Sequence, residues 1–259
     1  MTLVLTELSS IGMNSFGIAM ATDSAVTHIQ AQTGLSYVIP NAARKLQIIP
    51  HLNAGISCWG IGTITDIPTD QWLSNFINSN TSLTTLQSFA KELARQLNAQ
   101  VPSNTSGTSR LGFHLAAFEN CNGIPTPSFF HIHDGSSTVL EKRGITVNPY
   151  QFNANHDMPP EIFQQNFSNG SFYTTRNGDY QLYANIFGLL KQFFRQLEPL
   201  GILIPSSQNL LDRAEYLVFQ IRTTSEIYRL SNLVPGIGGG IYYLTINQNG
   251  IHSQGIRYF

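Results

Sequence analysis

The sequence predicts an α+β fold, a four-layer αββα sandwich in which two stacked antiparallel sheets each carry a helix layer on the outer face. Two observations lead to this prediction. Segments of strand character alternate with pairs of helical segments, in the order strands, two helices, strands, two helices, strands. In addition, Phe16–Thr22 (FGIAMAT) is apolar along its whole length, which is typical of a strand covered on both faces.

The N-terminal part of the chain has strand character. Thr2–Leu8 is a short apolar run with polar breaks, and the apolar run Phe16–Thr22 follows it. Two further strands are expected over Lys45–Ile49 and Leu52–Cys58, separated by a turn at Pro50-His51. We therefore expect four strands before the first helix.

Two pairs of helices are expected from apolar residues at helical spacing. The first pair covers the region of Trp72–Ile77 and then Leu83–Leu97, with Ser82 as the expected N-cap of the second helix. The second pair covers Tyr180–Leu197 and about Ser207–Leu230. Each pair interrupts a block of strands, as the layered fold requires.

The remaining strands lie between and after these helices. Gly112–Glu119 and Ser128–His133 have strand character, and Gly240–Ile246 and Ile251–Tyr258 form a C-terminal hairpin. The segment Asn148–Asn169 is rich in Asn, Gln and Pro and carries no clear period, so we expect a long excursion or flap there. Because the chain contains no repeat and no linker, we predict one domain over residues 1–259.

The composition excludes several classes of protein. The chain has 259 residues, 42% of them hydrophobic, with 14 Lys+Arg against 15 Asp+Glu, so neither general disorder nor a basic nucleic-acid interface is expected. No apolar run reaches the roughly 20 residues that span a bilayer, and Met1–Ser10 lacks the features of a signal peptide. Only Cys58 and Cys121 are present, too few for a disulfide framework. We expect a soluble cytoplasmic protein, without nucleic-acid or membrane partners.

Charged residues make up only 11% of the chain, where about 25% is usual. Asn, Gln, Ser and Thr take their place. A surface with so little like-charge repulsion favours self-association, which indicates a homo-oligomer.

Thr2, Asp23 and Lys45 form the strongest candidate for a catalytic site. A hydroxyl on the first residue of a mature chain has its own base, because an α-amine with a pKa of about 7.7–8 can accept the hydroxyl proton. An ammonium such as Lys45 beside it would stabilise the developing alkoxide, and Asp23 could neutralise and orient that ammonium. This chemistry requires removal of Met1.

Two other nucleophiles are conceivable. Thr6 would take the role if the first five residues were a propeptide, although Glu7-Leu8-Ser9 suits a first strand less well than Leu3-Val4-Leu5. Cys58 is flanked by apolar residues, which is typical of an inert core cysteine.

Two weaker motifs complete the candidates. His131 and His133 lie on one face of a strand, where a metal could bind, but no further His or Cys cluster supports a closed site. Gly60-Ile61-Gly62 and Gly236-Ile237-Gly238 are similar to fragments of a dinucleotide loop, but neither precedes a helix with the required downstream acid. We expect no metal and no organic cofactor.

Three segments resemble the proteasome β-type family of N-terminal-nucleophile (Ntn) hydrolases, including its HslV-like and Anbu-like bacterial members. Gly17–Thr27 (GIAMATDSAVT) is similar to the family's second strand. Arg44-Lys45-Leu46, followed by Ala54–Cys58 (AGISC), is similar to the catalytic-lysine strand and the small-residue segment after it. Gly238–Ile246 (GGGIYYLTI) and then Asn249-Gly250 resemble the family's glycine-rich strand and hairpin.

The resemblance implies a role for each matched residue. It implies Thr2 as nucleophile and base, Lys45 as electrostatic activator, Asp23 as the partner of Lys45, and a backbone N–H near Cys58 as oxyanion donor. The positions implied for substrate binding are Ser24, Ala25 and Thr27.

Two departures from the family pattern alter this site. Ala25 stands where the family has an arginine or small residue, which argues against a basic floor to the substrate pocket. A Gly-Ser-Gly that opens the family's third helix is replaced by Arg176–Asp179, so Asn177 or Thr175 would have to hold the amine.

The function implied is that of a threonine peptidase acting on peptides or unfolded protein, in a homo-oligomeric ring or helical array, with an unfoldase partner undefined. Two alternatives stay open. One is a catalytically silent structural or binding subunit that kept the fold; the other is an Ntn amidase acting on a small-molecule amide.

Overall fold

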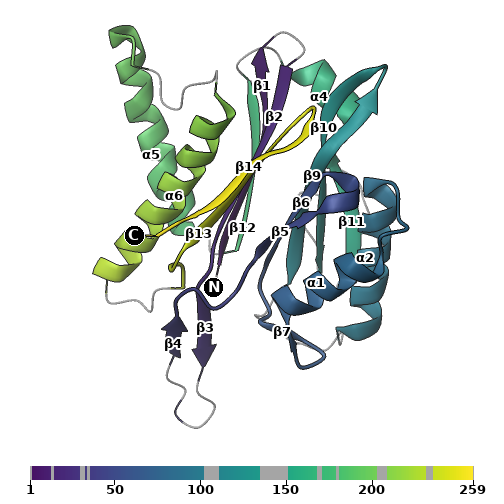
Figure 1. Ribbon diagram of the computed structural model, residues 1–259. Coiled ribbons are helices and arrows are strands. Elements are labelled where there is room, and N and C mark those ends of the chain that lie inside the picture. Colours follow the sequence, from purple (N-terminus) through teal and green to yellow (C-terminus); the bar gives the residue numbers. More distant parts are fainter. Residues whose placement is uncertain are drawn as a thin grey trace.

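The computed structural model of the chain describes residues 2–12, 15–29, 33, 36–101, 111–134, 151–167, 171–178, 181–202, 209–231 and 236–258. Within these residues the fold combines α-helices with antiparallel sheets (Figure 1). The predicted mixture of the two kinds of structure is therefore confirmed.

The strand that follows Thr2 lies inside a five-stranded antiparallel sheet. Its order is β12-β1-β2-β13-β14, so the N-terminal strands pair with the C-terminal hairpin. The start of β13 thereby lies beside the end of β2, where Ile241 pairs with Asp23. The strands are β1 (Leu3–Gly12), β2 (Ser15–Asp23), β12 (Phe172–Gly178), β13 (Ile241–Asn247) and β14 (Gly250–Arg257).

A second five-stranded antiparallel sheet has the order β11-β10-β9-β6-β5. Its strands are β5 (Leu46–Ile49), β6 (Ala54–Trp59), β9 (Gly112–Cys121), β10 (Ile124–Asp134) and β11 (Phe152–Met158). Two small ribbons extend from the sheets. They are β3 (Val26–Ile29) with β4 (Ser36–Ile39), and β7 (Thr63–Ile64) with β8 (Ile67–Pro68).

The longer helices lie in two pairs, and Figure 1 shows them on the outer sides of the two sheets. α1 (Thr69–Ser79) and α2 (Leu86–Gln100) share an apolar core with the second sheet, whereas α5 (Gln181–Leu197) and α6 (Leu210–Leu230) share one with the first. The shorter helical elements are α4 (Pro160–Asn166), η1 (Pro50–Leu52) and η2 (Glu198–Leu200).

A third apolar core lies between the two sheets. It contains Ile18 and Met20 from β2, Leu244 from β13, and Ala116 and Phe129 from β9 and β10. Strand β2 therefore contacts apolar residues on both faces, since Ala19 and Ala21 belong to the core with α5 and α6. This explains the unbroken apolar run at Phe16–Thr22.

Side chains of β1 alternate between the two faces of its sheet, as the pleat requires. Leu3 and Leu5 belong to the core with α5 and α6, and Glu7 contacts α6 through Arg213. Thr6 points the other way and contacts His114 of the second sheet. The same strand thus supplies residues to two separate regions of the molecule.

Several sequence predictions need correction. The N-cap of α2 is Thr85, which forms a capping box with Ser88, rather than Ser82. Asn148–Asn169 contains β11 and α4, so its described part is not an irregular flap. In both regions polar side chains obscured the boundaries, because Asn and Gln contribute no apolar period.

The segment Arg176-Asn177-Gly178 ends strand β12 and pairs with β1, rather than opening a helix. Gly178 has φ +92°, and a Cβ at this position would overlap the carbonyl oxygen of Thr2. Glycine is therefore required for β12 to lie against the first residue of the site. The strand was missed because FYTTRNG has few apolar residues.

No helix among the described residues is both long enough and apolar enough to cross a membrane.

Candidate active site

Thr2, Asp23 and Lys45 lie together, although they come from three separate parts of the chain. Thr2 precedes β1, Asp23 is the last residue of β2, and Lys45 precedes β5 of the opposite sheet. Lys45 Nζ donates a hydrogen bond to Thr2 Oγ1 at 2.7 Å and to Asp23 Oδ2 at 3.1 Å. All three residues are buried. The carboxylate is therefore linked to the threonine hydroxyl through the ammonium.

The ammonium of Lys45 is held by three acceptors. The third is the carbonyl oxygen of Ala25, which follows Asp23 by two residues. Since an ammonium carries three hydrogens, these bonds satisfy it fully and fix its direction. Lys45 thus presents one N–H to the Thr2 hydroxyl and uses the other two as anchors.

Asp23 is held by backbone donors as well as by Lys45. Oδ1 accepts from the N–H of Leu3 at 3.0 Å, and Oδ2 accepts from those of Ala25 at 3.1 Å and Gly238 at 3.4 Å. Burial raises the pKa of Asp23, and the charge of Lys45 with the hydrogen bonds from Leu3, Lys45 and Gly238 offsets part of this rise. Because both oxygens face donors, the arrangement suits the ionised carboxylate, which balances the charge of Lys45.

A small cavity of about 70 Å³ opens beside Thr2 and Lys45. Ala25 and Thr27 line it, as the sequence analysis expected of substrate-binding residues. Ser24 does not line it; the Ser24 hydroxyl donates to Asn41 Oδ1 at 3.1 Å. Ser24 therefore supports the turn after Asp23 rather than a substrate.

The peptide N–H of Cys58 is already used in the structure. It donates to the carbonyl oxygen of Lys45 at 2.9 Å, so among the N–H groups near Cys58 its own is already bonded within the protein. Burial raises the pKa of the Cys58 thiol to about 12, which keeps it protonated and agrees with an inert core cysteine. Gly60, at φ +102°, also lines the cavity, and it leads into β7 rather than into a dinucleotide-binding helix.

Asn177 and Thr6 are joined by a buried histidine that the sequence analysis missed. His114 of β9 lies between them, with Nδ1 2.9 Å from Thr6 Oγ1 and Nε2 2.8 Å from Asn177 Oδ1. Because the Asn177 oxygen can only accept, Nε2 carries the proton and Nδ1 accepts from Thr6. Thr6 lies in mid-strand with its hydroxyl bound to His114, which does not suit the alternative nucleophile.

The other amine-holding candidate, Thr175, has a buried hydroxyl with no hydrogen-bond partner among the described residues. Asn177 reaches His114, and its neighbour Gly178 lies against the Thr2 carbonyl. Asn177 thus braces the strand beside Thr2. A lone polar residue in the apolar run FHLAAF was the available signal for His114.

His131 and His133 lie side by side, with ring centroids 4.3 Å apart. His131 also contacts the rings of Trp59 and His114, and its Nδ1 lies 3.4 Å from Asp157 Oδ2. No group of three or more His, Cys, Asp or Glu residues suited to a metal occurs in the part of the chain that the structure describes. The pair belongs to a partly buried cluster of rings, in which His131 contacts both His133 and Trp59.

We expect the imidazoles of His114 and His131 to make the folded protein less stable in acid. Burial lowers the pKa of both His114 and His131 to about 3, so each stays neutral in the folded protein while the unfolded chain takes up a proton near pH 6.5. The free energy of unfolding is therefore unaffected by these groups above pH 6.5. It falls as the pH is lowered toward 3, by up to about 1.4 kcal/mol per pH unit for each histidine.

Urea unfolding at pH 7, 6, 5 and 4 measures this loss. His114→Gln should show a shallower decline of unfolding free energy than the wild type, whereas the exposed control His28→Gln should match the wild type. Equal slopes for wild type and His114→Gln would contradict the assignment.

No family model matches the chain, and none of the curated proteins matches it significantly.

Proposed function

We propose that this protein is a threonine-type N-terminal-nucleophile hydrolase that cuts amide bonds, with peptide bonds as its principal substrates. The observation that carries the proposal is the contact between Lys45 Nζ and Thr2 Oγ1 at 2.7 Å, anchored by Asp23. We also propose that the two sheets and their helix pairs form the four-layer αββα sandwich of proteasome-like hydrolases. The three matched sequence segments and the helix-to-sheet cores support this assignment.

The proposed reaction begins with removal of Met1, which frees the α-amine of Thr2. The Thr2 hydroxyl attacks the substrate carbonyl carbon, and the amine takes the hydroxyl proton. Lys45 lowers the energy of the developing alkoxide through its charge. The amine then returns the proton to the leaving nitrogen as the C–N bond breaks. Water hydrolyses the acyl-enzyme in the second step: the amine takes a proton from the attacking water and returns it to the Thr2 oxygen as the ester bond breaks.

We assign the oxyanion donor to the N–H of Gly60 rather than of Cys58. Alternate N–H groups of a strand point to the same side, and that of Cys58 points toward β5 and Lys45. The N–H of residue 60 continues this series at the end of β6, and Gly60 lines the cavity beside Thr2. A tetrahedral oxyanion there would lie between the peptide donor and the nucleophile.

The cavity beside Thr2 is lined by apolar and uncharged polar residues together with two charged ones, Lys45 and Asp70. Ala25 contributes no basic group, and the lining residues Thr27 and Ile61 are uncharged. This favours cleavage after residues without a large acidic side chain.

Exposed apolar side chains on the helix layer support a homo-oligomer, which would enclose the sites and restrict access to extended chains.

Covalent labelling tests the proposal. An α′,β′-epoxyketone bonds to both the hydroxyl and the free amine of an N-terminal threonine, so intact mass should show loss of Met1 and one added inhibitor. Thr2→Ala should abolish labelling, whereas Thr2→Ser should retain it. Thr6→Val, a matched control at the alternative nucleophile, should label like the wild type.

Other outcomes separate the remaining alternatives. Retained Met1 and no labelling would contradict the proposal and support a catalytically silent subunit. Labelling with hydrolysis of small amides but not of unfolded casein would restrict the substrate class to small molecules.

A further inference from the structure

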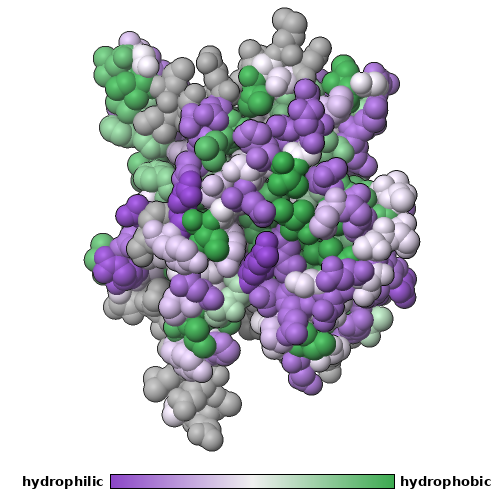
Figure 2. All heavy atoms as spheres, in the orientation of Figure 1, coloured by the Kyte–Doolittle hydropathy of each residue, from purple (hydrophilic) through white to green (hydrophobic). Residues whose placement is uncertain are grey.

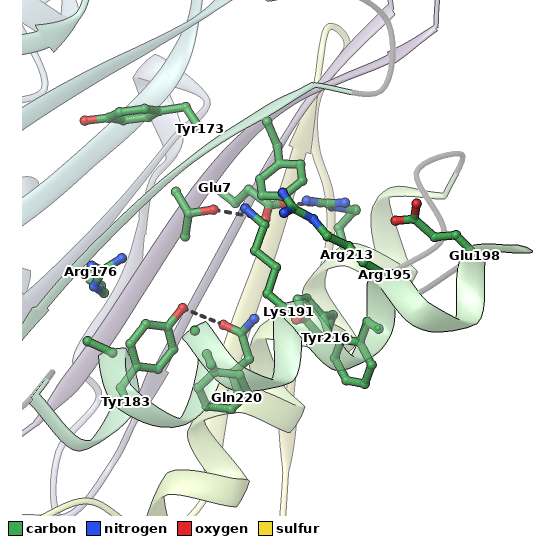
Figure 3. A pocket seen from close by; sticks show the side chains of 16 residues that line it. Glu7, Tyr173, Arg176, Tyr183, Lys191, Arg195, Glu198, Arg213, Tyr216 and Gln220 are labelled. Carbon is green, nitrogen blue, oxygen red and sulfur yellow. Dashed lines mark hydrogen bonds and ion pairs between the residues drawn. The ribbon is translucent and has the colours of Figure 1, made fainter. Parts of the chain in front are cut away.

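A second and larger cavity lies on the opposite face of the first sheet from Thr2. Its volume is about 610 Å³, within the range of sites for small organic ligands. The walls come from β1, β12, α5 and α6, and Figure 3 shows their side chains converging from these elements. The proposed hydrolytic chemistry uses none of its residues.

A buried ion pair forms the base of this cavity. Arg213 Nε of α6 donates to Glu7 Oε1, and both side chains are only 2% exposed. Thr174 Oγ1 donates to the other carboxylate oxygen at 3.2 Å. Burial raises the pKa of Glu7, whereas the charge of Arg213 and these hydrogen bonds lower it. Glu7 is thus held at both oxygens.

Arg213 keeps a donor that none of the described residues satisfies. Its Nη2 is buried and has no hydrogen-bond partner among the described residues. An arginine nitrogen can only donate, so this position calls for an acceptor atom. Because an unmatched buried donor is costly, a ligand oxygen placed there would remove an unfavourable feature of the empty protein.

Further positive charge surrounds the same opening. Arg176 of β12 and Lys191 and Arg195 of α5 line it together with Arg213, against the two acids Glu7 and Glu198. This excess of cations is notable in a chain whose net charge is −1. In Figure 3 the Lys191 side chain extends from α5 toward Glu7 and Arg213. The field inside the cavity therefore favours an anion.

Aromatic rings supply the rest of the wall. Phe172 lies over the Arg213 guanidinium, with its centroid 4.3 Å from Cζ, and 5.6 Å from Lys191 Nζ. Tyr183 is fixed by a hydrogen bond to Gln220 at 2.9 Å. The remaining rings of the wall are those of Tyr173, Phe187, Phe194 and Tyr216. Such a wall suits a flat apolar body, while the cations suit a charge at one end of it.

We propose that this cavity binds a small aromatic carboxylate. The carboxylate accepts from Arg213 Nη2 and pairs with Lys191, and the ring packs among the aromatic side chains. The site is separate from Thr2, because Glu7 and Thr6 point to opposite faces of β1. The proposal does not depend on hydrolytic activity.

Binding of three acids tests the proposal: indole-3-acetate, 4-hydroxyphenylacetate and 1-naphthoate. Each is compared with its primary amide, which keeps the ring and removes the charge. Isothermal titration of the full chain should show at least one acid binding about tenfold more tightly than its amide, with affinity falling as salt is added. The bound acid should also raise the Tm of Thr2→Ala, since the nucleophile plays no part.

Lys191→Gln provides the matched variant, because Lys191 is exposed and its loss leaves the buried pair intact. It should weaken acid binding about threefold or more, and the amide should be unaffected. Lys91→Gln, an exposed lysine on α2, should bind like the wild type.

Three results would overturn the proposal. They are no saturable binding of any of the three acids at millimolar concentration, equal affinity for acid and amide, or binding that Lys191→Gln does not change. A concentration-dependent dimer that Lys191→Gln dissociates, without acid binding, would instead assign the cavity to a second copy of the chain. Leu189 and Phe193 of α5 and Leu200 of η2 are exposed, and Figure 2 shows apolar surface at the end of α5. Light scattering in parallel therefore measures this outcome.

Discussion

Replacing Lys45 by methionine should lower kcat/KM for a fluorogenic peptide amide by about 10³-fold or more. The ammonium is the group that contacts Thr2 Oγ1, so its loss removes the charge that stabilises the alkoxide in the proposed mechanism, while the Thr2 amine and hydroxyl remain. Methionine keeps the length and the apolar stem of the side chain. A rate within a few fold of the wild type would contradict the proposed role of Lys45.

Loss of folding must be separated from loss of chemistry in this variant. Lys45→Met leaves Asp23 buried without its cation, which destabilises the protein. The double variant Asp23→Asn/Lys45→Met removes both charges and should recover thermal stability relative to the single variant. It should stay inactive, whereas recovery of activity would show that the ammonium is dispensable. Lys91→Met on α2 is the exposed control for activity and folding.

Arg213→Met should lower the free energy of unfolding by about 3–5 kcal/mol. The change leaves the Glu7 carboxylate in a site where its side chain is 2% exposed, with Thr174 as its remaining hydrogen-bond donor. The cost arises from an uncompensated buried charge rather than from the loss of a favourable ion pair. Urea unfolding at pH 7, monitored by circular dichroism, measures it.

The paired variant tests this cause. Glu7→Gln/Arg213→Met removes both charges and should recover most of the lost stability, because an apolar or neutral pair avoids the desolvation of two ions. Arg95→Met removes an exposed arginine of the Glu92 ion pair on α2 and should leave the unfolding midpoint unchanged. If the double variant were as unstable as Arg213→Met, packing of the arginine side chain would be the cause instead.

Much of the secondary structure follows from local sequence. The apolar run of β2 and the helical stripes of α1, α2, α5 and α6 were predicted because their side chains repeat at the period of the element that they form. β12 and β11 were not, since their residues are largely polar and only partly buried. Their strand conformation comes from pairing with β1 and β10, which a local pattern does not contain.

The candidate active site shows the same division. Thr2, Asp23 and Lys45 were identified because their residue types suit one reaction and the segments around them resemble a known family. The contribution of His114 depends on contacts with two other strands, and that of Gly178 on a close approach to Thr2. Both roles depend on tertiary structure, and the local sequence offered no more than one polar residue in an apolar run as a signal for His114.

The Glu7–Arg213 pair was also beyond local reasoning, since 206 positions separate its members. A glutamate within a first strand has no sign of burial in the sequence itself. Only the packing of α6 against the first sheet shows that its charge is neutralised.

Because successive side chains of β1 point to opposite faces of its sheet, this strand limits which mutations the protein can tolerate during evolution. A single-residue insertion between Thr2 and Thr6 would exchange inside and outside for the rest of the strand, turning Glu7 toward His114 and Thr6 toward α6. Point substitutions can alter one cavity and spare the other, whereas a change in the length of this segment would damage both together. Single residues of the two cavities can therefore change independently, whereas the number of residues along this segment is constrained by both cavities together.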